Sequence, residues 1–340
     1  MQQGVNFSWQ ATAFSIFAKP TVVTQSSSLG TSRTRSTVYE NNLARWVLGQ
    51  VKSVTDTTAG TVIESHTYHP TSALRTESYR HGLRVASYAW NADGTLYVVY
   101  DPASRATYYT NYKLGIAQNI SYPDGAGESA LVNALGLISQ HTNAAGTTTF
   151  YGYDTMGRLA QVTPPAEAGF AYNGTTQSFE SVPYAEYGLP AGHWRQTIST
   201  GNARSINYFD ALWRPVLSLT YDAANSAATS RMVQTRWDID GRKTFESYPQ
   251  RSITAYNSSV AGTAEVFDVL GRSSVRRQDS ELGLLSTTTE YLSGFQRRVT
   301  NPRGKITSYG YQVFDTPSED AIAWINAPES VSVRIARNLL

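Results

Sequence analysis

Two groups of residues in this 340-residue sequence have side chains that could do acid–base or metal chemistry. Asp238 and Asp240 are two positions apart, so on a strand their carboxylates would share one face, as a general acid and base require. His66 and His69 are three apart, so on a strand they would point to opposite faces. Asp238, however, lies in a turn motif, where Asp is expected to accept backbone N–H groups. We therefore predict no catalytic residues and no metal site.

No sequence pattern indicates a cofactor. Residues 125–130 (GAGESA) have the form GxGxxA, but a dinucleotide site needs a strand before it, a helix after it and an acidic residue about 20 positions later. Pro123 and Asp124 come directly before, and no suitable acid follows, so we interpret this segment as a turn. The chain contains no cysteine. We predict that it is not an enzyme, with a polysaccharide-active enzyme as a minor alternative.

The composition favours an extended β-sheet protein. Charged residues make up 16% of the chain, against about 25% in typical soluble domains. The net charge of +2 gives no general attraction to nucleic acid, so none is predicted as a partner. Tyr (22 residues) outnumbers Phe (11), as suits a pleated surface with a wet face. No apolar run approaches the ~20 residues that span a bilayer, and the start is not typical of a signal peptide.

The elements that must position these side chains come from a six-residue repeat: an aromatic residue, Asp, two variable residues, Gly and Arg. The repeat is complete at 153–158 (YDTMGR), 237–242 (WDIDGR) and 267–272 (FDVLGR). At 100–105 (YDPASR) and 209–214 (FDALWR), Ser and Trp take the Gly position. The Asp residues of the five copies are 53, 56, 28 and 30 positions apart. This spacing predicts a repeating unit of about 28 residues.

Each copy is expected to be a tight turn between two strands. The Asp side chain can accept hydrogen bonds from backbone N–H groups ahead of it, and Gly supplies a positive φ. The flanking residues alternate as strands do, and a lone hairpin is only marginally stable in water. The hairpins are therefore predicted to stack edge to edge into one continuous, curved or spiral antiparallel sheet, an all-β fold. Residues 142–153 and 300–311, identical at seven of twelve positions, support the repetition.

Several segments outside the repeats receive their own predictions. Residues 1–60 are expected to form a divergent N-terminal β segment, in which the Ser/Thr-rich residues 20–36 form an exposed connection. Residues 61–340 are expected to form the repeat sheet. Within it, residues 164–190 and 222–230 are predicted as loops, 319–326 as a short helix, and 331–335 as a strand. Residues 338–340 are expected to end within a strand, which would leave an open sheet edge.

The repeated motif and its Gly146-x-x-Thr149-x-Tyr151 lead-in resemble the YD repeat of the RHS family. The resemblance is strongest from about residue 85 to 315. It implies a wall segment of a spiral β-shell, as in bacterial polymorphic toxins, insecticidal toxin complexes and teneurins. The structural site residues predicted from the repeat are Asp101, Tyr153, Asp154, Gly157, Arg158, Asp210, Trp237, Asp238, Gly241, Arg242, Phe267, Asp268, Gly271 and Arg272. The Asp residues would cap turns, and the Arg residues would bridge to neighbouring strands.

The resemblance also implies partners and a location. In the bacterial relatives the shell encloses a C-terminal toxic domain, so we expect a non-catalytic shell segment that encloses or displays a toxin or effector domain. The expected partners are the remainder of a larger RHS protein, or a second copy, at the open sheet edge. The expected location is secreted or on a bacterial cell surface. The family's Asp-Pro-rich self-cleavage motif is absent, since Asp101-Pro102 lies inside an ordinary repeat.

A binding module for glycans or polyanions is the alternative function. Basic residues gather at Arg276-Arg277, Arg297-Arg298, Arg303 and Lys305, where a polyanion could bind. Consecutive arginines on a strand point to opposite faces, which favours a solvated strand instead. The abundant Tyr and Trp could stack on sugars, although Tyr at every second position of a strand more often packs across strands.

Overall fold

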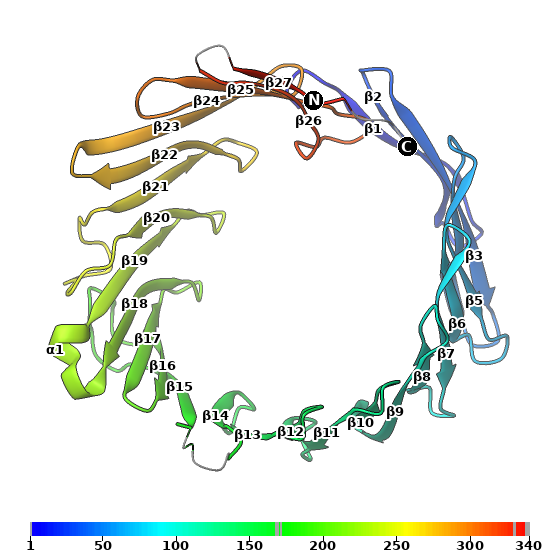
Figure 1. Cartoon of the computed structure of the whole chain (residues 1–340), viewed down its shortest axis with the longest axis horizontal. Coiled ribbons are helices and arrows are strands. Elements are labelled where there is room, and N and C mark those ends of the chain that lie inside the picture. Colours follow the sequence, from blue (N-terminus) through cyan, green and yellow to red (C-terminus); the bar gives the residue numbers. More distant parts are fainter. Residues whose placement is uncertain (1, 167–169, 171, 329–330, 337–340) are drawn as a thin grey trace.

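The computed structural model of this chain describes residues 2–166, 170, 172–328 and 331–336. This part of the chain is built almost entirely of strands, and consecutive strands pair antiparallel from β1 to β27. The strands follow one another around a ring (Figure 1). The predicted all-β class and the continuous curved sheet of stacked hairpins are both confirmed.

The strands up to residue 153 are β1 (Phe7–Phe14), β2 (Pro20–Ser27), β3 (Ser32–Asn42), β4 (Val47–Asp56), β5 (Thr61–Tyr68), β6 (Arg75–Arg80), β7 (Leu83–Trp90), β8 (Leu96–Tyr100), β9 (Ala106–Lys113), β10 (Ile116–Ser121), β11 (Gly127–Val132), β12 (Ile138–Thr142) and β13 (Thr148–Tyr153). The later strands are β14 (Leu159–Thr163), β15 (Thr175–Ser181), β16 (Trp194–Thr200), β17 (Ala203–Phe209), β18 (Pro215–Asp222), β19 (Arg231–Trp237), β20 (Lys243–Ser247), β21 (Gly262–Phe267), β22 (Ser273–Ser280), β23 (Gly283–Leu292), β24 (Gln296–Thr300), β25 (Ile306–Tyr311), β26 (Ile322–Asn326) and β27 (Ser332–Arg334). A short 3-10 segment, η1 (Ala223–Asn225), and one short helix, α1 (Ser226–Thr229), follow β18.

Because consecutive strands are antiparallel, their turns alternate between the two rims of the ring. We call the rim that carries the turns after odd-numbered strands the odd rim, and the other the even rim. At the odd rim the pairing shifts register at the aromatic repeat position, as where Tyr153 pairs with Leu159 and Trp237 with Lys243. Such bulges bend a strand and increase its twist. Their recurrence on one rim is a physical cause of the sheet's curvature.

The sheet is a single layer over much of its length, so both faces meet solvent. The chain exposes 20509 Å² of accessible surface, whereas a compact monomer of this mass would expose about 14,000 Å². Large apolar side chains are correspondingly exposed, including Val269, Ile239 and Leu282, which are at least 89% accessible. The ring therefore has an open surface that a compact domain would have buried.

One buried cluster covers a face of β17, β18 and β19. Tyr208, Leu217 and Met232 project from these strands, while Leu189 and Ile253 come from two irregular segments that lie over them. The two segments are joined by a hydrogen bond in which the Tyr256 N–H donates to the Tyr187 carbonyl at 2.8 Å. These excursions give this part of the ring a second layer.

A second buried cluster joins the two ends of the sheet, which we call the seam. Val5, near the N-terminus, packs with Phe295, Tyr311 and Val313, and Phe295 is 0% exposed. Phe7 meets Phe295 edge to face, with ring centroids 5.6 Å apart. Figure 1 shows β1 and β2 (blue) beside β26 and β27 (red) at the top of the ring.

The seam is closed by hydrogen bonds and packing, not by a strand ladder. The Gly294 N–H donates to the Gln3 carbonyl at 2.8 Å, and Thr31 Oγ1 donates to the Phe314 carbonyl at 2.6 Å. β1 pairs only with β2, and β27 only with β26, among the residues described. The 27-strand sheet is consequently an open one whose first and last parts touch.

Four sequence-based predictions of local structure were wrong. The Ser/Thr-rich residues 20–36 form β2 and the first part of β3 instead of an exposed connection, because their hydroxyl groups pair across strands, as Thr24 does with Thr34 at 2.9 Å. Residues 319–326 contain β26 instead of a helix, since pairing with β25 overrides local helix propensity. The segment 164–190, predicted as a loop, contains β15. The segment 222–230, also predicted as a loop, contains η1 and α1, because the side chains of Asp222 and Asn225 cap backbone N–H groups and start helical turns. Residues 338–340, predicted to end in a strand, lie outside the described part.

Candidate functional site

Five hairpin turns carry the repeat and share one geometry, seen clearly at Asp154. The Asp154 N–H donates to the Arg158 carbonyl at 2.9 Å, and the Gly157 N–H donates to the Asp154 carbonyl at 3.0 Å. Asp154 Oδ1 accepts from the N–H groups of Met156 and Arg158, both at 2.9 Å. Gly157 has a φ of +77°, a backbone region that non-glycine residues rarely adopt. The turn therefore needs a side-chain acceptor at its first position and a residue with positive φ at its fourth, a conformation that Ser104 and Trp213 also adopt in their copies.

The repeat arginine completes the turn with an ion pair to its own Asp. Arg Nε to Asp Oδ2 distances are 2.7 Å at Arg158, 2.6 Å at Arg242 and 2.8 Å at Arg272. The same pair forms at Arg105 with Asp101 and at Arg214 with Asp210. A carboxylate that accepts both backbone N–H groups and a guanidinium is strongly held in its ionised form.

These contacts lower the pKa of the repeat carboxyl groups. At Asp154, hydrogen bonds led by the Arg158 N–H hold the pKa below its ordinary value. At Asp238 and Asp268, partial burial acts to raise the pKa, but the N–H groups and guanidinium groups of Arg242 and Arg272 outweigh it, and the net shift is downward. The carboxylates are thus built to stay charged, which suits a structural cap and not a proton donor.

The arginines also contact the next hairpin, and these partners are not visible in the sequence. Arg158 donates to the Phe179 carbonyl at 3.2 Å and lies over the Phe179 ring. Arg214 donates to the carbonyl of Asp238 in the next repeat turn, at 2.6 Å. Arg242 lies 5.1 Å from the centroid of the Phe267 ring. Successive odd-rim turns are therefore linked to one another.

The repeat aromatic forms a second link, in the opposite direction along the chain. Tyr153 donates its hydroxyl hydrogen to the Ile138 carbonyl at 2.6 Å, and Trp237 donates Nε1–H to the Pro215 carbonyl at 2.9 Å. Each acceptor belongs to the preceding strand. Phe267 has no such donor, and its ring instead packs under Arg242.

Asp101 differs from the other four repeat Asp residues in its position. Its turn joins β8 to β9 and so lies on the even rim, whereas Asp154, Asp210, Asp238 and Asp268 lie on the odd rim. The spacing of 53 between Asp101 and Asp154 therefore spans five strands and not two whole hairpin units. The estimate of about 28 residues per unit holds only from Asp154 onward.

Sequence reasoning missed some turns of the same design that use Asn. Asn133 Oδ1 accepts from the N–H groups of Leu135 and Leu137, and Asn143 and Asn301 cap their turns in the same way. The pattern Asn-x-x-Gly, present at 133–136, 143–146 and 301–304, is the signal that would have found them.

Within the described residues, the side chains considered for acid–base or metal chemistry do not form a shared site. Arg242 binds both Asp238 and Asp240, at 2.6 Å each, so this acid pair serves the turn. His66 Nδ1 lies 3.2 Å from Ser78 Oγ, while His69 Nδ1 accepts two backbone N–H groups of its own loop. No cluster of three potential metal ligands occurs in the part described.

Two of the six residues in the basic cluster form ion pairs with carboxylates. Arg297 pairs with Glu319 at 3.3 Å, and Arg298 pairs with Glu290. Arg276 and Arg277 are exposed neighbours on β22 and so lie on opposite faces of the sheet. This arrangement does not form one convergent polyanion patch.

Comparison with protein families finds a match in the segment around Asp154. Residues 132–167 match the family described as RHS Repeat. The chain contains an RHS repeat. The match spans β12, β13 and β14 with the Asp154 turn, and it confirms the resemblance that the sequence motif suggested. No curated protein matches the chain.

The chain is also similar to several solved structures, at 10–11% sequence identity. TcdB2-TccC3-TEV is 10% identical, with a TM-score of 0.44, and the match covers 94% of this chain and 19% of that chain. TcdB2-TccC3-Cdc42 is 11% identical, with a TM-score of 0.42, over 99% and 19%. The Tc holotoxin pore of Photorhabdus luminescens is 10% identical, with a TM-score of 0.36, over 94% and 18%. The chain thus spans about one fifth of the length of these proteins.

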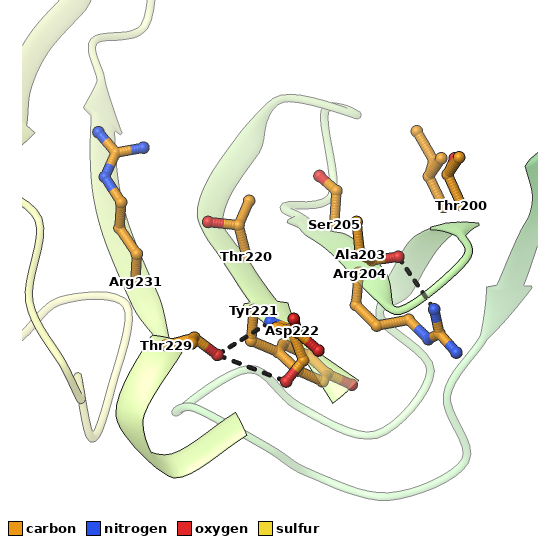
Figure 2. Close-up of a pocket in the computed structure, with 10 residues that line it drawn as sticks. Thr200, Ala203, Arg204, Ser205, Thr220, Tyr221, Asp222, Thr229 and Arg231 are labelled. Carbon is orange, nitrogen blue, oxygen red and sulfur yellow. Dashed lines mark hydrogen bonds between the residues drawn. The ribbon is translucent and has the colours of Figure 1, made fainter. Parts of the chain in front are cut away.

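The hollow beside α1 is lined by polar groups that do not form a site (Figure 2). It has a volume of about 470 Å³. Thr229 Oγ1 accepts from the Asp222 N–H at 2.9 Å, and Arg204 donates to the carbonyl of Ala203. Figure 2 shows the guanidinium groups of Arg204 and Arg231 pointing away from each other. These polar groups serve their own backbone and do not converge on a ligand.

A second hollow, which we call the rim cleft, has a volume of about 570 Å³. It is formed on the odd rim by the turns β3–β4, β5–β6 and β7–β8. Its lining combines Tyr88 and Trp90 with Arg45, His69 and Asp93.

No helix in the described part is long and apolar enough to cross a membrane.

Proposed function

We propose that this chain is a non-catalytic wall segment of an RHS-type shell that encloses or displays a toxin or effector domain. The observation that carries the proposal is the single-layer ring, which exposes 20509 Å² against the ~14,000 Å² of a compact monomer. A wall needs two accessible faces, one toward its content and one outward. The turn residues support it, because they serve strand-to-strand linkage. Residues 1–60 would form the divergent start of the wall and residues 61–340 its repeat part.

The proposed partner is the remainder of a larger RHS protein or a second copy. β1 and β27 each have a ladder partner on one side only among the residues described. A strand edge with free backbone groups is the natural place for further strands to add. Secretion, or display on a bacterial surface, is the proposed location, and fractionation of cells expressing the gene from its own locus tests it.

Electron cryomicroscopy of the complete gene product tests the shell role. We expect the 27-strand ring to continue into a larger wall, with density for another domain inside it or attached to it. A particle in which the ring joins no other wall and holds no other domain would refute the proposal. Turnover of a polysaccharide by the purified product would refute its non-catalytic part.

Of the alternative binding functions, glycan binding has a candidate site, whereas the basic cluster predicted for polyanions does not form one. Glu319 and Glu290 neutralise two of the clustered arginines. The rim cleft, by contrast, brings aromatic rings and polar groups to one place.

A further inference from the structure

The rim cleft is built by three turns that are far apart in the sequence and are tied to one another. Asn42 Nδ2 donates to the Pro70 carbonyl at 2.6 Å, and Arg45 Nε donates to the Thr71 carbonyl at 3.2 Å. From β4, Gln50 Nε2 donates to the Ala73 carbonyl at 2.9 Å. These bonds hold the β3–β4 turn against the β5–β6 loop. The cleft is therefore pre-formed, which lowers the entropy cost of binding.

Two aromatic rings of β7 form one side of the cleft. Tyr88 and Trp90 are two positions apart and so share a face of the strand. Their ring centroids are 6.3 Å apart and their planes are inclined by 31°. Trp90 is fixed by its Nε1–H, which donates to the Arg75 carbonyl at 2.7 Å. A fixed pair of aromatic faces suits the flat C–H face of a sugar ring.

Two hydrogen-bond donors lie at the rim of this platform. His69 Nδ1 accepts from the N–H groups of Thr71 and Ser72, at 3.3 and 3.2 Å. In this neutral form the other nitrogen, Nε2, carries the hydrogen and is a donor. Arg45 uses only Nε for its bond to the Thr71 carbonyl, so its terminal nitrogens are available to a carboxylate in a paired geometry.

An acceptor stands on the remaining side. Asp93 Oδ1 accepts from both the N–H and the hydroxyl group of Thr95, at 2.9 and 2.7 Å. These bonds lower the pKa of Asp93, which keeps the carboxylate ionised. Its second oxygen can then accept from a ligand hydroxyl group.

We propose that the rim cleft binds an acidic saccharide, a pyranose chain that carries carboxylates. One sugar ring stacks on Trp90 and Tyr88, its carboxylate pairs with the Arg45 guanidinium and His69 Nε2–H, and a hydroxyl group donates to Asp93. An aromatic platform surrounded by both donors and acceptors fits the apolar faces and polar edges of a sugar better than it fits an acidic peptide. This inference rests on the cleft and is independent of the shell role.

Calorimetric titration of the full chain with tetragalacturonic acid tests the proposal, with maltotetraose as the neutral probe. We expect the acidic probe to bind with a Kd of about 0.1–1 mM and maltotetraose about tenfold more weakly. Arg45→Gln and Tyr88→Ala should each weaken binding of the acidic probe about tenfold. Arg105→Gln, on the even rim, and Trp213→Phe, on a separate aromatic cluster, are the matched controls and should leave Kd unchanged.

Several results would overturn this inference. They are no binding of tetragalacturonic acid at about 10 mM, equal binding of maltotetraose, or an unchanged Kd in Arg45→Gln. Arg45-dependent binding of tetraglutamate as tight as that of the sugar would reassign the cleft to acidic peptides. Because Arg45 is exposed at a turn, its substitution is not expected to prevent folding, and the circular dichroism melting curve checks this.

Discussion

The guanidinium carbon of Arg272 lies 3.8 Å from the centroid of the Tyr291 ring. Arg272 belongs to the turn after β21, and Tyr291 is near the end of β23, the next odd strand. The same arginine pairs with Asp268 in its own turn and donates to Gln3 Oε1 at the seam, at 3.2 Å. One side chain thus joins a turn, the following hairpin and the N-terminal segment.

Replacing the planar guanidinium tests the link between hairpins. We expect Arg272→Lys to lower the free energy of unfolding by about 1 kcal/mol, because an ammonium group loses the stacked geometry. A double-mutant cycle with Tyr291→Leu, measured by urea unfolding, should give a coupling of about 0.5–1 kcal/mol. Arg105→Lys is the control, since Arg105 makes the same turn ion pair and is highly exposed. Equal losses at both arginines would show that the ring contact contributes nothing.

The lowered pKa values of the repeat carboxyl groups predict sensitivity to acid. The unfolded chain, with an Asp pKa of about 3.9, binds protons that the folded turns exclude. The stabilisation is therefore present above pH ~4 and is lost as the pH falls through the lower folded-state values. Urea midpoints between about pH 6 and 3 should show this decline. In the combined Asp154→Asn, Asp238→Asn and Asp268→Asn variant, the urea midpoint should decline less steeply as the pH falls. An identical decline in this variant and in the unchanged protein would contradict the prediction.

Gly157 tests the turn backbone. A side chain at φ +77° is strained, although the nearest atom to an added Cβ, in Leu137, is at an ordinary 3.6 Å. We expect Gly157→Val to lower the free energy of unfolding by about 1–3 kcal/mol. Gly157→Asn should cost less, because Asn tolerates positive φ. Unchanged melting temperatures for both variants would count against the turn assignment.

The seam predicts that one buried ring holds the two ends together. Phe295→Ala should destabilise the protein by about 3–5 kcal/mol through the cavity it leaves. The milder Val5→Ala keeps the fold and tests the same cluster. Spin labels at Ser28→Cys and Thr316→Cys are unambiguous, because the chain has no cysteine.

We expect the distance distribution between these labels to broaden in Val5→Ala. It should stay narrow in Leu282→Ala, whose side chain is 90% exposed at a hairpin tip. A narrow distribution in both variants would mean that the polar contacts of the seam, which include the Arg33–Asp315 ion pair at 3.1 Å, close it without the cluster.

The sequence by itself determined the turns and the all-β class. The bonds from Asp154 to Met156 and Arg158 stay within five residues, so the chemistry of one short segment specifies them. Strands that follow one another pair as neighbours, so the order of the sheet was also predictable. Local propensity predicted a helix at 319–326, but pairing with β25 makes the end of this segment the strand β26.

Tertiary structure alone decided which distant residues meet. Gln3 and Gly294 come together because small bends accumulate over many strands. The total curvature cannot be predicted from any short segment of the sequence. The rim on which Asp101 lies depends on the number of strands between its turn and the other repeat turns. The cleft of Arg45, His69 and Trp90 likewise exists only because the turns of alternate strands emerge on the same rim.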